Sequence, residues 1–424
     1  MLPLGLVVLL ILFFTGVPMY VAFASGGTIL HLFYCDAPLI TMVSYMVHAL
    51  DSWTLMAVPF FILCGELMAR SRLSKELVDF CDSWVGWLPG GLAISLVLAT
   101  VIFGAISGSG IAAIAAIGLI MVPRMLELGY PKGFTIGLSA ASAQLGVLIP
   151  PSIPLILFSS LTETSVPGLF AAGVVPGLML ATMMIIVSVI FATRGHWPRS
   201  RVFTWHERWT AFVKAIPALF MPVLILGGIY GGIFSPTEAA LVATFYCLIF
   251  GLASRRLDWK VTMEASISMA RISGIIFLLV ATTVVFGKVM IYARVPHMIT
   301  TWVAEAGLSL GLFLSVIALL YLVIGCFAEV IIITLVTVPI LFPVTTAMGI
   351  HPYAFAIIMT MGVVVAGITP PVGVNIYTAS GVYNVPAASV IKNIWPFLIV
   401  EIICLFIVAH VPALSTGLPG LLGL

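Results

Sequence analysis

Two short segments place a pair of prolines in the middle of long uncharged stretches. Residues 146–154 read GVLIPPSIP and residues 367–373 read GITPPVG. Proline has no N–H group to donate and clashes with the preceding turn, at a cost of about 3 kcal/mol in a helix interior. A helix that breaks there leaves C=O groups unpaired, which suit a sodium ion, and N–H groups unpaired, which suit a carboxylate. These segments therefore favour the binding of a small anion together with a cation.

Two further segments carry small or polar residues inside apolar runs. Residues 104–110 read GAISGSG, in which Ser107 and Ser109 supply hydroxyl groups and the glycines allow a tight turn close to a ligand. Residues 325–330 read GCFAEV, and a carboxylate such as Glu329 near membrane depth is costly and usually functional. The alternatives are helix packing through small residues at the first segment and a glutamate at a hydrated cavity entrance at the second.

The composition requires that these segments lie in a membrane protein. Of 424 residues, 62% are hydrophobic and only 8% are charged, whereas a soluble domain carries about 25% charged residues. Several apolar runs exceed the roughly 20 residues that span hydrocarbon as a helix. The N-terminal MLPLGLVVLLILFF lacks a basic leading region and a cleavage site, so we expect a retained first helix. The six cysteines show no CxxC spacing, which predicts neither a disulfide nor a metal site, and the net charge of +2 gives no reason to expect a nucleic-acid partner.

The positive charges predict how the chain crosses the bilayer. Two long runs, 91–126 and 310–347, are interrupted near the middle, and we interpret each as a re-entrant hairpin. Every Lys and Arg except Lys288 and Arg294 then falls on one side of the membrane. Because cytoplasmic loops are enriched in Lys and Arg, that side is predicted to be the cytoplasm, with both termini on the periplasmic side.

The two diproline segments belong to an internal repeat. A shift of 220 residues maps Pro150 onto Pro370 and also maps Pro123 onto Pro343. By the predicted topology the two copies are inverted, and secondary transporters build their sites from broken helices at the interface of such repeats. The predicted organisation is as follows: scaffold helices 1–51; a first repeat 52–192 with scaffold helix, arm, cytoplasmic-side hairpin 91–126, broken helix 132–163 and helix 167–192; connecting helices 193–269; a second repeat 270–413 with scaffold helix, arm, outer-side hairpin 310–347, broken helix 352–384 and helix 395–413; and a tail 414–424.

Some charged and aromatic residues lie outside these motifs. Residues 76–87 and 296–306 are expected to form interfacial helices, either as arms between a fixed scaffold and a moving core or as ordinary membrane anchors. Glu66 and Lys288 occupy related positions in the repeat, and either could line the transport path or extend toward an interface; we favour the interface. No partner can be named for Glu401.

With these residues assembled, the chain resembles the large membrane subunit of tripartite ATP-independent periplasmic (TRAP) transporters. The resemblance covers nearly the whole chain and rests on FGAISGSG (103–110), GYPKGF (129–134), LGVLIPPSIPLILF (145–158), AAGVVPG (171–177), SPTEAA (235–240), GCFAE (325–329) and GITPPVGVNIYTASG (367–381). At the second tip this chain has Glu329-Val330 where the family usually has Asp followed by Pro.

The resemblance implies a fold and a function. It implies an all-α, inverted-repeat transporter similar to the ion-transporter superfamily, in which a core with two re-entrant hairpins and two proline-broken helices moves as an elevator against a scaffold. It implies sodium-coupled import of organic acids such as C4-dicarboxylates, sialic acid or sugar acids across the bacterial inner membrane. The implied partners are a small four-helix membrane subunit and a soluble periplasmic binding protein, with sodium as the coupling ion and no other cofactor.

Site residues follow from the resemblance and from the motifs. The expected substrate-binding residues are Ser107, Ser109, Pro151, Ser152, Glu329, Thr369 and Asn375. The expected sodium-binding residues are Gly104, Ser107, Gly108, Gly146, Ile149, Pro150, Gly325, Ala328, Gly367, Thr369 and Pro370.

Two alternative functions use the same residues. One is a stand-alone sodium/anion symporter, exchanger or channel with this core and no binding protein. The other is an intramembrane serine hydrolase, because ISGS (106–109) is weakly similar to the serine motif of membrane proteases. A serine nucleophile needs a general base within hydrogen-bond reach, and all seven histidines fall in expected loops or near helix ends. The sequence therefore favours a transporter over an enzyme.

Overall fold

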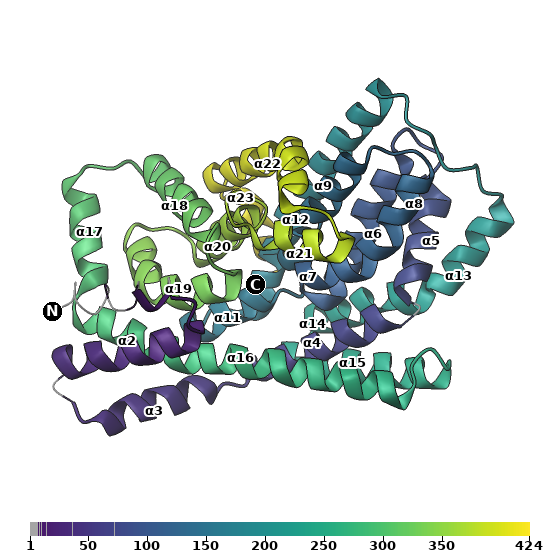
Figure 1. Ribbon diagram of the computed structural model, residues 1–424. Coiled ribbons are helices and arrows are strands. Elements are labelled where there is room, and N and C mark those ends of the chain that lie inside the picture. The colour runs from purple at the N-terminus through teal and green to yellow at the C-terminus, as the bar shows by residue number, and fades with distance from the viewer. Residues whose placement is uncertain (1–6, 8, 10, 14, 36, 72) are drawn as a thin grey trace.

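The chain folds into a helical membrane protein. The structure, a computed structural model, describes every residue except 1–6, 8, 10, 14, 36 and 72, so most of the expected first helix and Arg72 lie outside the described residues (Figure 1). Every element within the described part of the chain is helical. Eight of the described helices are long and apolar enough to cross a bilayer, or nine if α3 and the bent helix after it, 61° apart, form one span. The predicted all-α, multi-pass architecture is confirmed.

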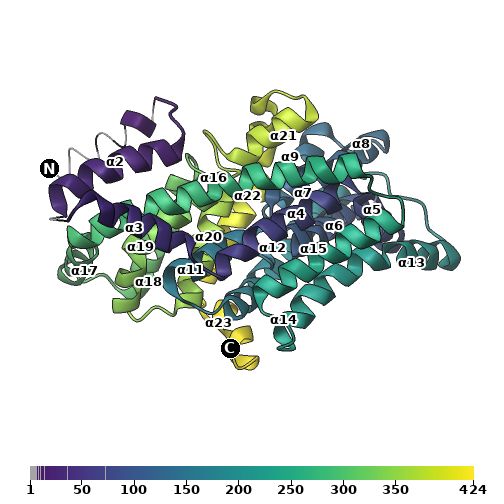
Figure 2. The same cartoon turned by 90° about the horizontal axis from the view of Figure 1, so that it is seen from below.

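Long helices form one layer of the molecule. α16 packs against α2, α3 and α4, and α15 packs against α4. Figure 1 shows α2, α16 and α15 running along one side, and Figure 2 shows α16, α15, α3 and α4 crossing the face that is seen from below. This outer layer consists of α2 (Met19–Tyr34), α3 (Leu39–Leu50), the short η1 (Thr54–Met56), α4 (Ala57–Arg70), α13 (Trp205–Pro222), η3 (Val223–Gly227), α14 (Gly228–Tyr230), α15 (Pro236–Ala253) and α16 (Trp259–Tyr292).

The remaining helices pack on this layer as two similar sets. The first set is α6 (Gly91–Ser107), α7 (Gly110–Ala113), η2 (Ile114–Gly118), α8 (Leu119–Glu127), α9 (Lys132–Ser142), α10 (Leu145–Leu148), α11 (Ile153–Thr162) and α12 (Val166–Arg194). The second set is α18 (Leu310–Gly325), α19 (Val330–Ala347), α20 (Pro352–Ala366), α21 (Val374–Tyr383) and α22 (Ala387–His410). Each set therefore contains a helical hairpin, a helix broken at the diproline pair, and a long final helix.

Each hairpin folds back at the segment rich in small or polar residues. α6 packs against α7, η2 and α8, and α18 packs against α19. Gly108 ends α6 with a φ of +62°, a conformation that glycine adopts without strain. The second arms then begin with side-chain caps, because Ser109 Oγ accepts a hydrogen bond from the Ala112 N–H and the Glu329 carboxylate accepts one from the Ile331 N–H. We call residues 107–110 tip 1 and residues 326–329 tip 2.

Both diproline pairs lie where a helix is interrupted. Residues 149–152 separate α10 from α11, and residues 367–373 separate α20 from α21. The Pro150–Pro151 and Pro370–Pro371 peptide bonds are both cis. In a continuous helix the carbonyls of Gly146 and Val147 would accept from residues 150 and 151, which as prolines have no N–H to donate. The sequence therefore interrupts the backbone ladder at this point.

The two sets interlock through the second halves of their broken helices. α11 of the first set packs against α19 of the second, and α21 of the second packs against α7, η2 and α9 of the first. The Phe158 and Phe342 rings meet edge to face at 5.7 Å between centroids. The Ser139 and Tyr383 hydroxyls lie 2.5 Å apart. Each broken helix thus supports the hairpin of the other set.

Three shorter elements complete the fold. α5 (Leu73–Val85) and α17 (Val295–Glu305) follow α4 and α16 and occupy the positions expected for the two interfacial helices, predicted to be arms or membrane anchors. The segment 414–424, expected to be a tail, is mostly helical, because α23 (Ala413–Leu421) packs against α12 and buries Ser415 and Pro419. Its apolar residues are sufficient to dock it on the core.

Candidate functional site

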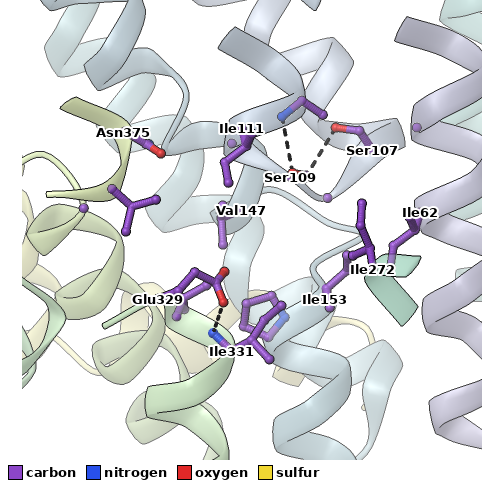
Figure 3. A pocket seen from close by; sticks show the side chains of 18 of the residues that line it. Ile62, Ser107, Ser109, Ile111, Val147, Ile153, Ile272, Glu329, Ile331 and Asn375 are labelled. Carbon is purple, nitrogen blue, oxygen red and sulfur yellow. Dashed lines mark hydrogen bonds between the residues drawn. The ribbon is translucent and has the colours of Figure 1, made fainter. Parts of the chain in front are cut away.

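A cavity of about 630 Å³ lies where both hairpin tips, both broken helices and the outer layer meet (Figure 3). Tip 1 and tip 2 both contribute to its wall, as do α4 and α16 of the outer layer. Sites for small organic molecules are about 300–1,000 Å³ and mostly apolar, with a few placed polar groups. The cavity has the size and position of a ligand site between the two repeats.

The wall of the cavity is largely apolar, with polar groups at a few places. Figure 3 shows Ile62, Val147, Ile153 and Ile272 around it, with Glu329 pointing inward. The polar and charged lining residues among those described are Glu66, Arg70, Ser107, Ser109, Gln144, Glu329 and Asn375. No histidine lines the cavity within the described residues, so neither serine of tip 1 has a nearby imidazole base there.

Tip 1 sits directly on the first break. A Cβ atom added to Gly104 would lie 2.6 Å from the Gly146 Cα, and one added to Gly108 would lie 2.7 Å from the Pro151 carbonyl oxygen. Only glycine permits such an approach of two backbones. On its other side the tip touches the outer layer, where a Cβ on Gly65 would lie 2.9 Å from the Ser107 Cβ. These contacts hold tip 1 against the break and against α4.

Unpaired carbonyl groups gather at these points. Among the described residues, no backbone or side-chain group donates a hydrogen bond to the carbonyls of residues 105–108 or 146–151. The first run ends α6 and the second contains the diproline break, so the last carbonyls of two helices are left without partners. Hard cations such as sodium take oxygen ligands, and backbone carbonyls are suitable ones.

The second repeat reproduces this arrangement. A Cβ on Gly325 would lie 2.5 Å from the Ala366 Cβ, so tip 2 is held against the second break as closely as tip 1 is against the first. The Gly373 N–H also donates to the Cys326 carbonyl at 3.3 Å. Within the described residues the carbonyls of Gly325, of residues 327–328 and of residues 368–372 have no donor. Both breaks therefore offer oxygen ligands beside a hairpin tip.

The predicted site residues divide into two groups. Those that line the cavity are Ser107, Gly108, Ser109, Gly325, Ala328, Glu329, Gly367 and Asn375. Those that do not line it but lie in the tips and breaks behind the wall are Gly104, Gly146, Ile149, Pro150, Pro151, Ser152, Thr369 and Pro370.

The hydroxyls predicted in the second group lie away from the cavity. The Ser152 side chain is fully buried, and its Oγ has no partner among the described residues. Thr369 Oγ1 donates to the Val365 carbonyl at 2.9 Å. The structure thus places these two hydroxyls behind the cavity wall.

Other lining residues were not predicted to belong to the site. Gln144 is buried and its Nε2 has no partner among the described residues; its signal was a lone amide in the uncharged stretch before the first break. Of the two interpretations of Glu66, the structure favours a place in the cavity wall over the interface. Glu66 lines the cavity because its carboxylate is held by Arg70 at 3.0 Å and by the Ser268 hydroxyl at 2.9 Å. Lys288 lies outside the cavity, 5.7 Å above the Tyr45 ring.

Ion pairs connect the arm α5 to its neighbours on the side predicted to be cytoplasmic. Arg124 of α8 pairs with Asp79 at 3.1 Å and with Asp82 at 2.5 Å, and Arg256 pairs with Glu76 at 2.5 Å. Burial raises the pKa of the fully buried Asp82 carboxyl, although Arg124 acts in the opposite direction. α5 is thereby linked both to α8 of the first hairpin and to the loop between α15 and α16.

Comparison with known proteins assigns the family. Residues 6–414 match the model of the DctM component of tripartite ATP-independent periplasmic transporters. The chain belongs to this family. It is 36% identical over 401 residues to the C4-dicarboxylate TRAP transporter large permease protein DctM of Pseudomonas aeruginosa, covering 94% of each chain. It is likewise 36% identical over 402 residues to the ectoine/5-hydroxyectoine TRAP transporter large permease protein UehC of Ruegeria pomeroyi, covering 93% of this chain and 92% of that protein.

The fold has a more distant relative among solved structures. The YdaH transporter of Alcanivorax borkumensis superposes with a TM-score of 0.66 at 13% identity, over 89% of this chain and 88% of that one. The similarity extends to the fold alone. The predicted membership of the TRAP large-subunit family is confirmed, and the chain is a transport permease subunit and not an enzyme.

Proposed function

We propose that this TRAP large permease imports an organic acid together with sodium through the cavity between its two repeats. The observation that carries the proposal is the meeting of unpaired carbonyls from both tips and both breaks beside a cavity with hydroxyl and amide groups. The carbonyls of residues 146–151 and 368–372 supply neutral oxygen ligands on two sides. Two pseudo-equivalent sodium positions, one at each break, follow from the repeat.

The cavity suits a small organic acid. The hydroxyls of Ser107 and Ser109 and the amides of Gln144 and Asn375 can donate hydrogen bonds to a carboxylate, while the isoleucines pack against its carbon skeleton. The two relatives carry C4-dicarboxylate and ectoine in their names, and both solutes contain a carboxylate. C4-dicarboxylates, sialic acid and sugar acids are the substrates to test.

The contacts of α4 with tip 1 and of α16 with α19 support an elevator-type movement. A Cβ on Gly65 of α4 would meet tip 1 at 2.9 Å, and one on Gly287 of α16 would meet Pro339 of α19 at 3.0 Å. Both outer-layer helices thus face the hairpins through apolar contacts, with glycine at these two points and with Ile332, Val336 and Ile340 of α19 packed against the α16 cluster of Phe286, Val289 and Met290. Apolar contacts of this kind can slide. The core with the site would move against α4 and α16, and the hairpins would enter the bilayer from opposite sides.

We further infer the setting in which this happens. The chain sits in the bacterial inner membrane with its Lys- and Arg-rich side in the cytoplasm and both termini in the periplasm. A soluble periplasmic binding protein delivers the substrate, and a small four-helix subunit sits beside the outer layer in the bilayer.

Reconstitution tests the proposal. The chain is placed in proteoliposomes with a TRAP small subunit and a periplasmic binding protein, and uptake of labelled succinate, sialic acid and ectoine is measured under an inward sodium gradient. We expect uptake of at least one solute that requires all three components and collapses when potassium replaces sodium. Equal uptake by the chain alone would favour a stand-alone symporter, and equal uptake without sodium would remove sodium from the mechanism.

A further inference from the structure

One positively charged side chain lines the cavity among the described residues, and it lies on the outer layer. Arg70 is at the end of α4, five residues after Gly65, which touches tip 1. At 1.5 Å per residue the two Cα atoms are about 7.5 Å apart along the helix axis. Arg70 and Ser107 both line the same cavity.

Two carboxylates hold Arg70, and they differ in how firmly they are held. Glu66 Oε2 accepts from Arg70 Nε at 3.0 Å, while Glu66 Oε1 accepts from the Ser268 hydroxyl at 2.9 Å. Glu264 accepts from Arg70 Nη1 at 3.2 Å, and its side chain is 49% exposed. Glu66 has two partners, is only 25% exposed and orients the guanidinium, whereas Glu264 forms a solvent-screened and therefore weak pair.

We propose that Arg70 is a substrate-binding residue, and that an acidic group of the substrate replaces Glu264 on its guanidinium while Glu66 keeps it in position. The inference rests on the proposed function and specifies the substrate class as an acid that reaches from tip 1 to the wall formed by α4. An arginine fork matches a carboxylate or sulfonate, and such charge-assisted bonds are stronger than bonds between neutral groups. Displacing Glu264 costs little because its pair with Arg70 is screened.

The position of Arg70 has a further consequence. Ser107 and Asn375 lie on the hairpin and broken helix, but Arg70 lies on α4 of the outer layer. If the core moves, the substrate loses Arg70 as soon as tip 1 leaves Gly65. The contact is therefore made in the arrangement seen here, and it sets affinity on one side of the transport cycle.

The test is a comparison of three variants in the reconstituted three-component transporter, with succinate and its monoamide succinamate as probes. Arg70→Gln should raise the KM for succinate by about tenfold to a hundredfold. Glu264→Gln, which removes the competing carboxylate, should lower the same KM by up to about fivefold. Arg271→Gln is the matched control, because it removes a positive charge from α16 outside the cavity, and should leave the KM unchanged.

The monoamide separates binding from a structural role. In the wild-type protein succinamate should have a higher KM than succinate, and Arg70→Gln should reduce that difference. A merely structural Arg70 would leave the ratio of the two KM values unchanged, and Glu264→Gln would then act in the same direction as Arg70→Gln. Either result overturns the inference while the proposed function stands. Failure of the wild-type protein to take up any organic acid overturns the proposed function and the inference with it.

Discussion

Tip 1 brings hydroxyls and no charge to the cavity, whereas tip 2 brings a carboxylate. In tip 1 the Ser109 hydroxyl caps the helix that runs from Gly110 to Glu127. This cap is neutral, so no carboxylate of the tip balances the partial positive charge at the helix N-terminus. In tip 2 the α19 N-terminus is already paired with the Glu329 carboxylate. The same backbone arrangement thus gives one end that favours an anion and one end that favours a cation.

The difference in charge between the tips lets us assign each tip a role in the proposed transport cycle. An acidic substrate is attracted to tip 1 and repelled by Glu329, so we place its acid group near Ser107 and Ser109. Under the proposed function, we place sodium near the Glu329 carboxyl group and the unpaired carbonyls of Gly325 and Ala328. This assignment moves Glu329 from the substrate set to the sodium side of the site.

The largest effect should come from separating tip 1 from its break. Gly104→Ala places a methyl group 2.6 Å from the Gly146 Cα. Because the contacted atom belongs to the backbone of the break, the first hairpin must shift to make room. Overpacking of this kind costs about 1–3 kcal/mol and displaces the carbonyl ligands, so we expect uptake to fall by more than about tenfold. Gly381→Ala, with no atom within 4 Å of its added Cβ, is the matched control and should transport normally. Normal uptake by the Gly104→Ala protein would contradict the packing account.

The next effect should distinguish the two tips through sodium. Glu329→Gln keeps a hydrogen-bond acceptor for the Ile331 N–H but removes the charge, and we expect the sodium concentration for half-maximal uptake to rise by about tenfold. The KM for succinate at saturating sodium should change little. A rise in the succinate KM with an unchanged sodium dependence would reverse the assignment of the tips.

At tip 1 we expect a smaller effect, on the KM for succinate and not on the sodium dependence. Ser107→Ala removes a neutral donor that lines the cavity, and loss of such a hydrogen bond corresponds to an increase of about threefold to tenfold in the succinate KM. The Ser152 hydroxyl is buried behind the wall, so Ser152→Ala should have the smaller effect on KM. Equal KM values for the Ser107→Ala and wild-type proteins would exclude a substrate contact there.

The smallest effect is on thermal stability, and it arises at the ends of the hairpins away from the tips, where the two hairpins differ in charge. Arg124 of the first hairpin pairs with the arm α5, whereas α19 contains no charged residue. Burial raises the pKa of Asp82 in the folded protein above its ordinary value of 3.8. Between pH 3.8 and that raised pKa, the folded protein therefore binds more protons than the unfolded protein. The thermal midpoint should therefore fall as pH rises through that window, on the order of a degree. Asp82→Asn should flatten this dependence and Asp79→Asn should not; an unchanged slope in Asp82→Asn would assign it to other groups.

The sequence predicts those parts of the site that depend on local backbone chemistry. The diproline pairs interrupt the helices where expected, because a missing N–H acts within one turn, and the glycines of the tips allow the predicted turns. The wall formed by α4 was not predictable, since it depends on the packing of α4 against α15 and α16, which are distant in the sequence. Ser152 and Thr369 were predicted in the site by position, and both lie in the breaks behind the cavity wall.

The central claim is that the bare carbonyls at the two breaks bind sodium, and direct binding of radioactive ²²Na⁺ to the purified protein tests it. We predict saturable binding in the absence of substrate that unlabelled sodium displaces and potassium does not, that succinate strengthens by thermodynamic linkage, and that Gly104→Ala weakens. Absence of saturable binding, or equal binding by the wild-type and Gly104→Ala proteins, would contradict the account.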